Sequence, residues 1–304
     1  MPDNPNQSRR ANGEYGPVIY RQDKVAVPTD DNSNQLIDTA RARREAYRRK
    51  VSDLARIGTN TYIHNSNIGD STIRDGAKII DSHVGDGTNV GANAFVHASN
   101  LAESNEVGAD SSIISSQLGS RQGNIGILDH VSIVASQIGQ GTFVNSYASI
   151  QVSIIGKTCS FARGSLVVNS RVGNNSVFGE KCDVQGADIA ASVLLGRGVT
   201  IAGGSLVMSH TIIGDDVHIG AGVILGQRVL THNNVTIRAA SNVGHDVVIE
   251  DGVAIGAGAD IGDGALLSKG CVIEDGARVR PGMRVKSGET IHNIYGHNEV
   301  NQEA

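Results

Sequence analysis

The sequence predicts an all-β protein in which short strands wind into one long coil. From Ile213 to Ile291 an aliphatic residue recurs at every sixth position, with Thr231 as the one exception. Most of these residues are followed by Gly, a small residue or an acidic residue. A six-residue period with small residues between strands is typical of stacked coils that turn a corner after each strand. The 38 Gly, the lack of Trp and the 3% of aromatic residues also indicate a thin aliphatic core.

The preceding part of the chain carries the same pattern with shorter coils. Its coil starts follow a 17-residue period with one longer step, from Leu118 to Ile138: Val84, Leu101, Leu118, Ile138, Ile155, Val172 and Ile189. Each regular step divides into faces of six, six and five, and a Ser lies two residues before the next coil start: Ser66, Ser82, Ser99, Ser116, Ser136, Ser153 and Ser170. Residues 57–291 are therefore predicted to form one three-sided prism of about 13 coils, with 17-residue coils to about 188 and 18-residue coils after it.

The chain ends differ from the repeat. Residues 1–34 are polar and predict a flexible arm. Residues 35–56 predict an α-helix that caps the first coil, because apolar residues including Val51 and Leu54 share one face. Its basic face is interpreted as solvated rather than as a nucleic-acid surface, since the formal net charge is −5. Residues 292–304 are expected to be a C-terminal tail.

The sequence has no segment typical of a membrane protein and only three Cys. No run of 18 apolar residues is present, and the polar start lacks a signal-peptide core, so we expect a cytoplasmic protein without membrane insertion. Cys159, Cys182 and Cys271 each occupy an inward small position of the repeat. They are expected to be reduced thiols that fill the core.

The period and the Gly-containing turns resemble the hexapeptide-repeat family over roughly residues 57–291. The resemblance implies a left-handed parallel β-helix and a homotrimer. The 17-residue coils with their Ser ladder look like the β-helical tails of sugar-nucleotide pyrophosphorylases. The nucleotidyl-transfer domain of those enzymes is absent here, which argues against that activity.

His245 is the leading catalytic candidate. It lies in Val-Gly-His-Asp-Val-Val-Ile, residues 243–249, which is similar to the register of the general-base His in acyltransferases of this family. The resemblance implies transfer of an acyl group, which we expect to be acetyl, from acyl-CoA to an amine or hydroxyl of a sugar or sugar nucleotide. An imidazole that titrates near neutrality can accept the proton which the attacking group loses.

Coil arithmetic places polar residues beside His245. The 18-residue period puts Ser209, Gln227, His245 and Asp263 in one column and His210, Arg228, Asp246 and Gly264 in the next. Successive coils are about 4.8 Å apart, within side-chain reach. Asp246 or Asp263 could orient the imidazole, and Ser209, His210, Gln227 and Arg228 are candidate substrate contacts. A solvated edge of the prism would show the same pattern.

The donor site is inferred from the resemblance. In the family, coenzyme A lies along small residues and its phosphates meet basic side chains near the C-terminal coils. The corresponding candidates here are Gly256, Gly258, Lys269 and Arg280. Terminal coils also carry basic residues simply to remain soluble.

Two other functions stay open at this point. One is a non-catalytic structural or regulatory scaffold, suggested by the many coils without polar columns. The other is a carbonic-anhydrase-like zinc enzyme, which needs three converging His; His210, His245 and His232 are the candidates, but His232 is predicted on another edge. No metal is expected for the leading hypothesis.

Overall fold

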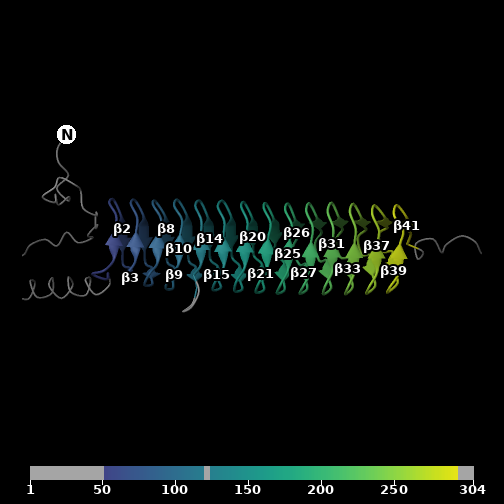
Figure 1. Cartoon of the computed structure of the whole chain (residues 1–304), viewed down its shortest axis with the longest axis horizontal. Helices are drawn as coiled ribbons and strands as arrows, with labels where there is room; N and C mark the ends of the chain where they lie inside the picture. The colour runs from purple at the N-terminus through teal and green to yellow at the C-terminus, as the bar shows by residue number, and fades with distance from the viewer. Residues whose placement is uncertain (1–50, 120–123, 294–304) are drawn as a thin grey trace, which may run out of the picture. The chain divides into compact units, whose positions relative to one another are not determined.

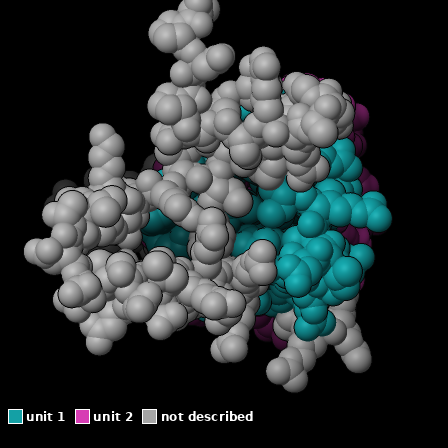
Figure 2. Space-filling model, turned by 90° about the vertical axis from the view of Figure 1, so that its left-hand side faces the viewer, with its two compact units in different colours: residues 1–134 teal, residues 135–304 magenta. Residues whose placement is uncertain are grey.

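The computed structural model describes residues 51–119 and 124–293. The chain divides into two compact units, residues 1–134 and 135–304, which are coloured separately in Figure 2. Every regular element in the described residues is a β-strand of two or three residues. The described ranges contain no helix with the length and apolarity needed to cross a membrane.

Unit 1 is a parallel β-solenoid with three faces, whose strands recur in the same order coil after coil (Figure 1). Face 1 contains β1 (Arg56–Ile57), β4 (Thr72–Ile73), β7 (Asn89–Val90), β10 (Glu106–Val107) and β13 (Gly126–Ile127). Face 2 contains β2 (Tyr62–His64), β5 (Lys78–Ile80), β8 (Phe95–His97), β11 (Ser112–Ile114) and β14 (Ser132–Val134). Face 3 contains β3 (Asn67–Ile68), β6 (His83–Val84), β9 (Asn100–Leu101) and β12 (Gln117–Leu118).

Unit 2 has the same three-faced architecture. Face 1 contains β16 (Phe143–Val144), β19 (Ser160–Phe161), β22 (Val177–Phe178), β25 (Leu194–Leu195), β28 (Ile212–Ile213), β31 (Leu230–Thr231), β34 (Val248–Ile249), β37 (Leu266–Leu267) and β40 (Arg284–Val285). Face 2 contains β17 (Ser149–Gln151), β20 (Leu166–Val168), β23 (Asp183–Gln185), β26 (Thr200–Ile201), β29 (His218–Ile219), β32 (Thr236–Ile237), β35 (Ala254–Ile255), β38 (Val272–Ile273) and β41 (Thr290–Ile291). Face 3 contains β15 (Gln137–Ile138), β18 (Ile154–Ile155), β21 (Arg171–Val172), β24 (Asp188–Ile189), β27 (Leu206–Val207), β30 (Ile224–Leu225), β33 (Asn242–Val243), β36 (Asp260–Ile261) and β39 (Arg278–Val279).

The predicted change of coil length is confirmed. Ile189 pairs with Val172 in the coil before it and with Val207 in the coil after it, so the shorter period gives way to the longer one at this strand. The strand ladder of unit 2 passes through Ile189 without a break. In unit 1 the one longer step appears as the pairing of Val107 with Ile127. The two units together hold about 14 coils rather than the expected 13, and the left hand stays a prediction.

The core has two columns of inward side chains on each face, one from the strands and one from the small or β-branched residues that precede them, such as Val193, Val217 and Cys271. The second residue of a two-residue strand and the middle residue of a three-residue strand point inward, because successive side chains alternate across a strand. These inward residues are almost entirely Ile, Val and Leu with exposures of a few per cent or less. Phe161 and Phe178 are the aromatic exceptions, and their buried rings lie 4.7 Å apart.

The Ser ladder closes the five-residue face. Each Ser is buried, and the Oγ of Ser82, for example, donates to the carbonyl of Ile80 and accepts the N–H of Ser99 at 3.2 Å. The residue before each Ser has a positive φ, as at Asn65 and Ala98, and only two residues separate the strands at this corner, for example between β5 and β6, against four between β4 and β5. The ladder ends where Ala187 donates its N–H to Ser170 Oγ. After that point this face is six residues long, like the other two, and four residues connect its strands to the next face.

The predicted N-terminal helix does not extend to residue 56. Residues 35–50 lie outside the described ranges. Val51 forms an isolated bridge to Ile68, and Arg56 begins β1. Leu54, expected on the buried helix face, is 73% exposed. Backbone pairing with the neighbouring coil overrides the helical spacing here, because an unpaired strand edge is costly.

The three cysteines are buried, as expected. The Sγ of Cys182 donates to the Gly196 carbonyl at 3.0 Å. Burial raises the pKa of the Cys159 thiol and raises the pKa of Cys182 and of Cys271 to about 11. The thiolate form is therefore disfavoured at neutral pH.

Ser99→Ala should lower the free energy of unfolding by about 1–3 kcal/mol, since the buried N–H of Ser116 loses its acceptor. Urea titration measures the change. Ser112→Ala, on the outer face of β11, is the control and should stay within about 0.5 kcal/mol of the parent. Equal losses in the two variants would contradict a stabilising role for the ladder.

The buried thiols should be inert to Ellman's reagent at pH 8 while the protein is folded. All three should react promptly in 6 M guanidinium, because the high thiol pKa values depend on burial. Fast reaction of any one thiol in the native protein would show that its site opens to solvent.

Candidate functional site

The predicted polar columns lie on one corner of unit 2, between faces 3 and 1. Ser209, Gln227, His245 and Asp263 each stand two residues after a face 3 strand. The backbone connects them coil to coil: Arg228 donates its N–H to the Ser209 carbonyl, and Asp246 donates to the Gln227 carbonyl at 2.9 Å. The structure thus brings together the residues that the coil arithmetic placed together.

The imidazole of His245 faces the preceding coil. Its Nδ1 accepts the backbone N–H of Gln227 at 2.9 Å. A neutral ring held this way carries its proton on Nε2. No described residue is within hydrogen-bond distance of Nε2, and the side chain is half-buried.

This bond recurs along the solenoid with other residue types. Nine corner residues accept a backbone N–H from the preceding coil through a side-chain oxygen in the described ranges: Asp75, Asp86, Asp129, Asn174, Asp215, Asn233, Asp251, Asp263 and Asp275. All nine are Asp or Asn. His245 therefore supplies the same backbone contact with a ring that retains a second nitrogen.

Neither predicted carboxylate contacts the His245 ring. Asp263 Oδ1 accepts the backbone N–H of His245 at 2.7 Å, so it holds the main chain and not the imidazole. Asp246 binds the Arg228 guanidinium through both oxygens, at 2.6 and 2.7 Å. Hydrogen bonding to Arg228 lowers the pKa of Asp246 and raises the pKa of Arg228. Because the opposite charges of Arg228 and Asp246 are paired, the two exposed side chains together offer little net charge to an anionic ligand.

His210, Arg228 and Asp246 share a backbone feature that the sequence did not suggest. Their φ angles are +63°, +56° and +58°, in the left-handed region. Gly264 follows in the same column with φ +66°. These residues make the turn itself, and the side chains of His210, Arg228 and Asp246 are exposed beside the His245 column.

The four predicted coenzyme A contacts do not converge. Gly256 and Gly258 lie at the corner between faces 2 and 3, Lys269 at the corner between faces 1 and 2, and Arg280 at the corner between faces 3 and 1. Packing explains why residue 256 is Gly, because a Cβ there would come within 2.4 Å of the Asp275 backbone nitrogen. Gly258 has a positive φ of 64°.

The corner between faces 2 and 3 nevertheless presents a smooth edge. Over four coils its outward positions are small: Gly203, Gly204, Ala221, Gly222, Ala239, Ala240, Ala257 and Gly258. A cation at this corner is Arg238, which lies 3.6 Å from Asp275. Lys269 and Arg280 belong to other corners.

The three candidate zinc ligands do not form one site. His210 and His245 occupy the corner between faces 3 and 1, whereas His232 follows β31 on face 1. Across the described ranges, no group of three or more His, Cys, Asp or Glu side chains is arranged to hold a metal ion.

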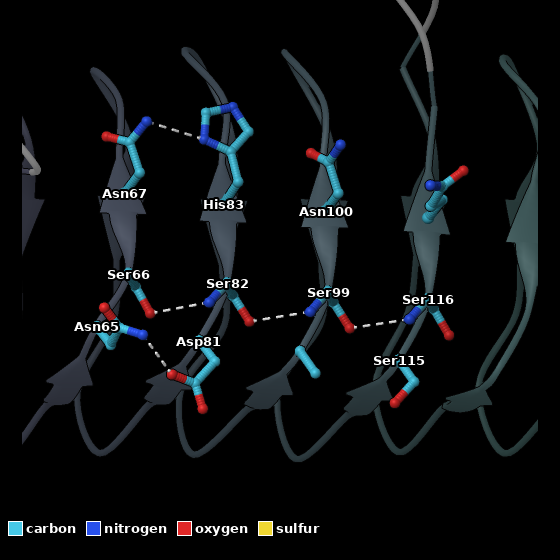
Figure 3. A pocket seen from close by; sticks show the side chains of 12 residues that line it. Asn65, Ser66, Asn67, Asp81, Ser82, His83, Ser99, Asn100, Ser115 and Ser116 are labelled. Carbon is cyan, nitrogen blue, oxygen red and sulfur yellow. Dashed lines mark hydrogen bonds between the residues drawn. The ribbon is translucent and has the colours of Figure 1, made fainter.

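A polar groove in unit 1 was missed at the sequence level. It has a volume of about 490 Å³ and follows the short corner beside the Ser ladder (Figure 3). Its lining includes the row Asn67, His83, Asn100 and Gln117, with Asn67 Nδ2 3.1 Å from His83 Nδ1. The sequence signal is the polar residue that precedes each coil start. The predicted site residues all lie in unit 2, away from this groove in the sequence.

Comparisons with known proteins give likeness only at the level of structure. No family model and no curated protein matches the chain. The acetyltransferase domain of PglB from Neisseria gonorrhoeae is 19% identical, with 33% of this chain and 47% of that chain covered and a TM-score of 0.32. This chain therefore spans less than half of that domain's structure.

Two UDP-N-acetylglucosamine acyltransferases are also similar. The Moraxella catarrhalis enzyme is 21% identical over 67% of this chain and 69% of its own, with a TM-score of 0.24. The Bacteroides fragilis enzyme is 14% identical over 77% and 70%, with a TM-score of 0.24. These three solved structures are of acetyltransferases or acyltransferases. The strand pairing of the chain itself confirms the parallel hexapeptide-repeat solenoid that the sequence predicts.

Proposed function

We propose that this protein transfers an acyl group from an acyl thioester, acyl-CoA, to an amine or hydroxyl of a sugar or sugar nucleotide, with His245 as general base. One observation carries the proposal. An imidazole occupies a corner position at which nine others use Asp or Asn, and the backbone contact there engages only Nδ1. Among the described residues, none gives the second nitrogen a structural task.

The general-base role requires the ring to leave the Gln227 N–H. Breaking that exposed hydrogen bond costs about 0.5–1.5 kcal/mol. General-base catalysis contributes about 10²- to 10⁴-fold in rate, or roughly 3–5 kcal/mol of barrier. The gain exceeds the cost, so the resting contact is compatible with the role.

The reaction balances with one proton transfer at His245. The oxygen or nitrogen of the acceptor attacks the thioester carbonyl carbon. Its proton passes to His245 Nδ1, the nitrogen that is released from the Gln227 N–H. The new C–O or C–N bond forms as the C–S bond breaks, and the thiolate takes the proton back from the imidazolium. Asp263 acts as a positioning residue in this scheme, since it holds the His245 main chain.

The acceptor would lie on the corner between faces 3 and 1. Ser209, His210, Gln227 and Arg228 project there, and His210 and Gln227 are exposed. The Arg228 guanidinium is engaged by Asp246. We expect it to recognise hydroxyl or amide groups rather than a phosphate.

The donor would lie along the small-residue corner between faces 2 and 3, away from Lys269 and Arg280. That corner and the His245 corner are opposite edges of face 3. The two halves of the site would then come from different copies. This supports the homotrimer that the resemblance implies, and a cytoplasmic location completes the proposal.

A non-catalytic scaffold is the second candidate. It is favoured by the equivalence of the His245 contact with those of Asn233 and Asp251. In that case His245 would contribute only a backbone hydrogen bond.

His245→Asn separates the two functions, because Asn keeps an acceptor for the Gln227 N–H but cannot act as a base. With acetyl-CoA and UDP-glucosamine as probes, the rate of thiol release should fall about 10²- to 10⁴-fold while the melting temperature stays unchanged. His245→Ala should lose both activity and, by about 1 kcal/mol, stability.

Asn233→Ala is the matched control, since it removes the same backbone contact at another corner without removing an imidazole. It should lose stability and retain activity. Undiminished activity in His245→Asn would exclude the general base. An absence of acetyl-CoA binding by calorimetry in the parent protein would instead favour the scaffold.

A further inference from the structure

The groove in unit 1 has two rows of side chains, one on each side of the buried Ser ladder (Figure 3). The strand row consists of the first residues of face 3 strands: Asn67, His83, Asn100 and Gln117. The corner row consists of the residues that precede each Ser: Asn65, Asp81, Ala98 and Ser115. The Ser hydroxyls between the rows are bonded to backbone groups, as at Ser82. A ligand in the groove would therefore meet the two rows.

The turn at this corner does not require polar rows. At the same corner of unit 2, Val152 precedes Ser153 and Ile154 follows it, with exposures of 58% and 48%. Val152 has the same positive φ, +51°, and Ser153 Oγ still accepts the N–H of Ser170 at 3.2 Å. The fold thus accepts exposed apolar residues at both positions. The polarity of the rows in unit 1 needs another explanation.

The rows present hydrogen-bonding groups that are only partly used within the chain. Asn67 Nδ2 lies 3.1 Å from His83 Nδ1, and Asn65 Nδ2 donates to Asp81 Oδ1 at 2.8 Å. The amides of Asn100 and Gln117 are exposed and have no partner among the described residues. Each amide offers two donors and an acceptor oxygen. This set of groups matches a ligand that carries many hydroxyls.

Paired rings on face 2 border the groove. The ring centroids of Phe95 and His97 are 5.9 Å apart, and the two planes are within 7° of parallel. His97 Nε2 is 3.9 Å from Asp81 Oδ2, so this ring pair lies beside the corner row. Rings with apolar faces and polar edges can pack against the C–H groups of a sugar while its hydroxyls reach polar neighbours.

The charge of the groove restricts the class of ligand. Asp81 is the one carboxylate among its lining residues, and no Lys or Arg is among them. A phosphate or carboxylate would find no cation there, and a lipid would find no apolar lining. An extended peptide would find no open strand edge, because β6 is bonded to β3 on one side and to β9 on the other.

We infer that this groove binds a neutral, linear glycan that runs along the two rows. The rows repeat about every 4.8 Å, close to the advance of one pyranose ring in an extended chain, so successive sugars would meet equivalent side chains. The groove volume of about 490 Å³ is within the range of about 300–1,000 Å³ for small-molecule sites. The inference rests on unit 1 and does not depend on the proposed catalysis.

The first experiment screens the full chain on an array of linear glycans, both neutral and acidic. Neutral glycans should be retained and acidic glycans should not, because no cation lines the groove. Calorimetry with a length series of the retained glycan should show an affinity that rises up to about four sugars, one for each residue of the strand row, and then levels off.

The second experiment locates the site with matched lysine variants. Ala98→Lys places a long side chain across the groove and should weaken glycan binding at least ~10-fold. The variant should fold, since Asp81 and Ser115 carry side chains at the same position with φ of +50° and +51°. Val152→Lys changes the equivalent corner residue of unit 2 and should keep the parent affinity.

The third experiment tests the amides. Asn100→Ala removes one exposed amide and should weaken glycan binding about 2- to 10-fold, the range expected for a single hydrogen bond. Asn242→Ala is the matched control, because Asn242 is the first residue of a face 3 strand in unit 2. It should bind the glycan like the parent protein.

Three results would overturn the inference: no retention of any neutral glycan, stronger retention of acidic than of neutral glycans, or equal losses of affinity in Ala98→Lys and Val152→Lys. Melting temperatures of the variants check that the solenoid remains folded. His245→Asn should keep the parent glycan affinity while acyl transfer is lost, so failure of the glycan site and failure of the proposed catalysis are told apart.

Discussion

Coil-to-coil backbone hydrogen bonding is the constraint on which the rest of this structure depends. Each strand is only two or three residues long, so it is stable only while its N–H and C=O groups are paired with the coils before and after it. Equal spacing follows, and with it the vertical alignment of equivalent residues. The aliphatic core, the Ser ladder and the corner carboxylates are all columns that this alignment creates.

The sequence predicts what the period determines. The two coil lengths, the inward cysteines and the column of Ser209, Gln227, His245 and Asp263 all follow from spacing, and the structure has them. The contacts made by side chains within a column do not follow from spacing. Whether Asp246 turns to His245 or to Arg228 depends on side-chain geometry, and the bidentate pair with Arg228 is the stronger interaction.

Two other expectations met competing interactions. The helical spacing of Val51 and Leu54 gave way to backbone pairing with the first coil. Gly256, Gly258, Lys269 and Arg280 are near one another in sequence, yet they occupy three corners because a chain that turns every six residues separates its neighbours.

The constant register of the C-terminal coils restricts which insertions and deletions the fold can accept. Between Ile213 and Ile291 every column repeats with the same interval, as in the pairing of Asn242 with Asp260 and of Asp260 with Arg278. Removal or duplication of one whole coil would keep each later residue on its own face, whereas a change of any other length would rotate the remainder around the axis. Such a protein can evolve in length by whole coils, and its surfaces would grow or shrink in proportion while their chemistry is preserved.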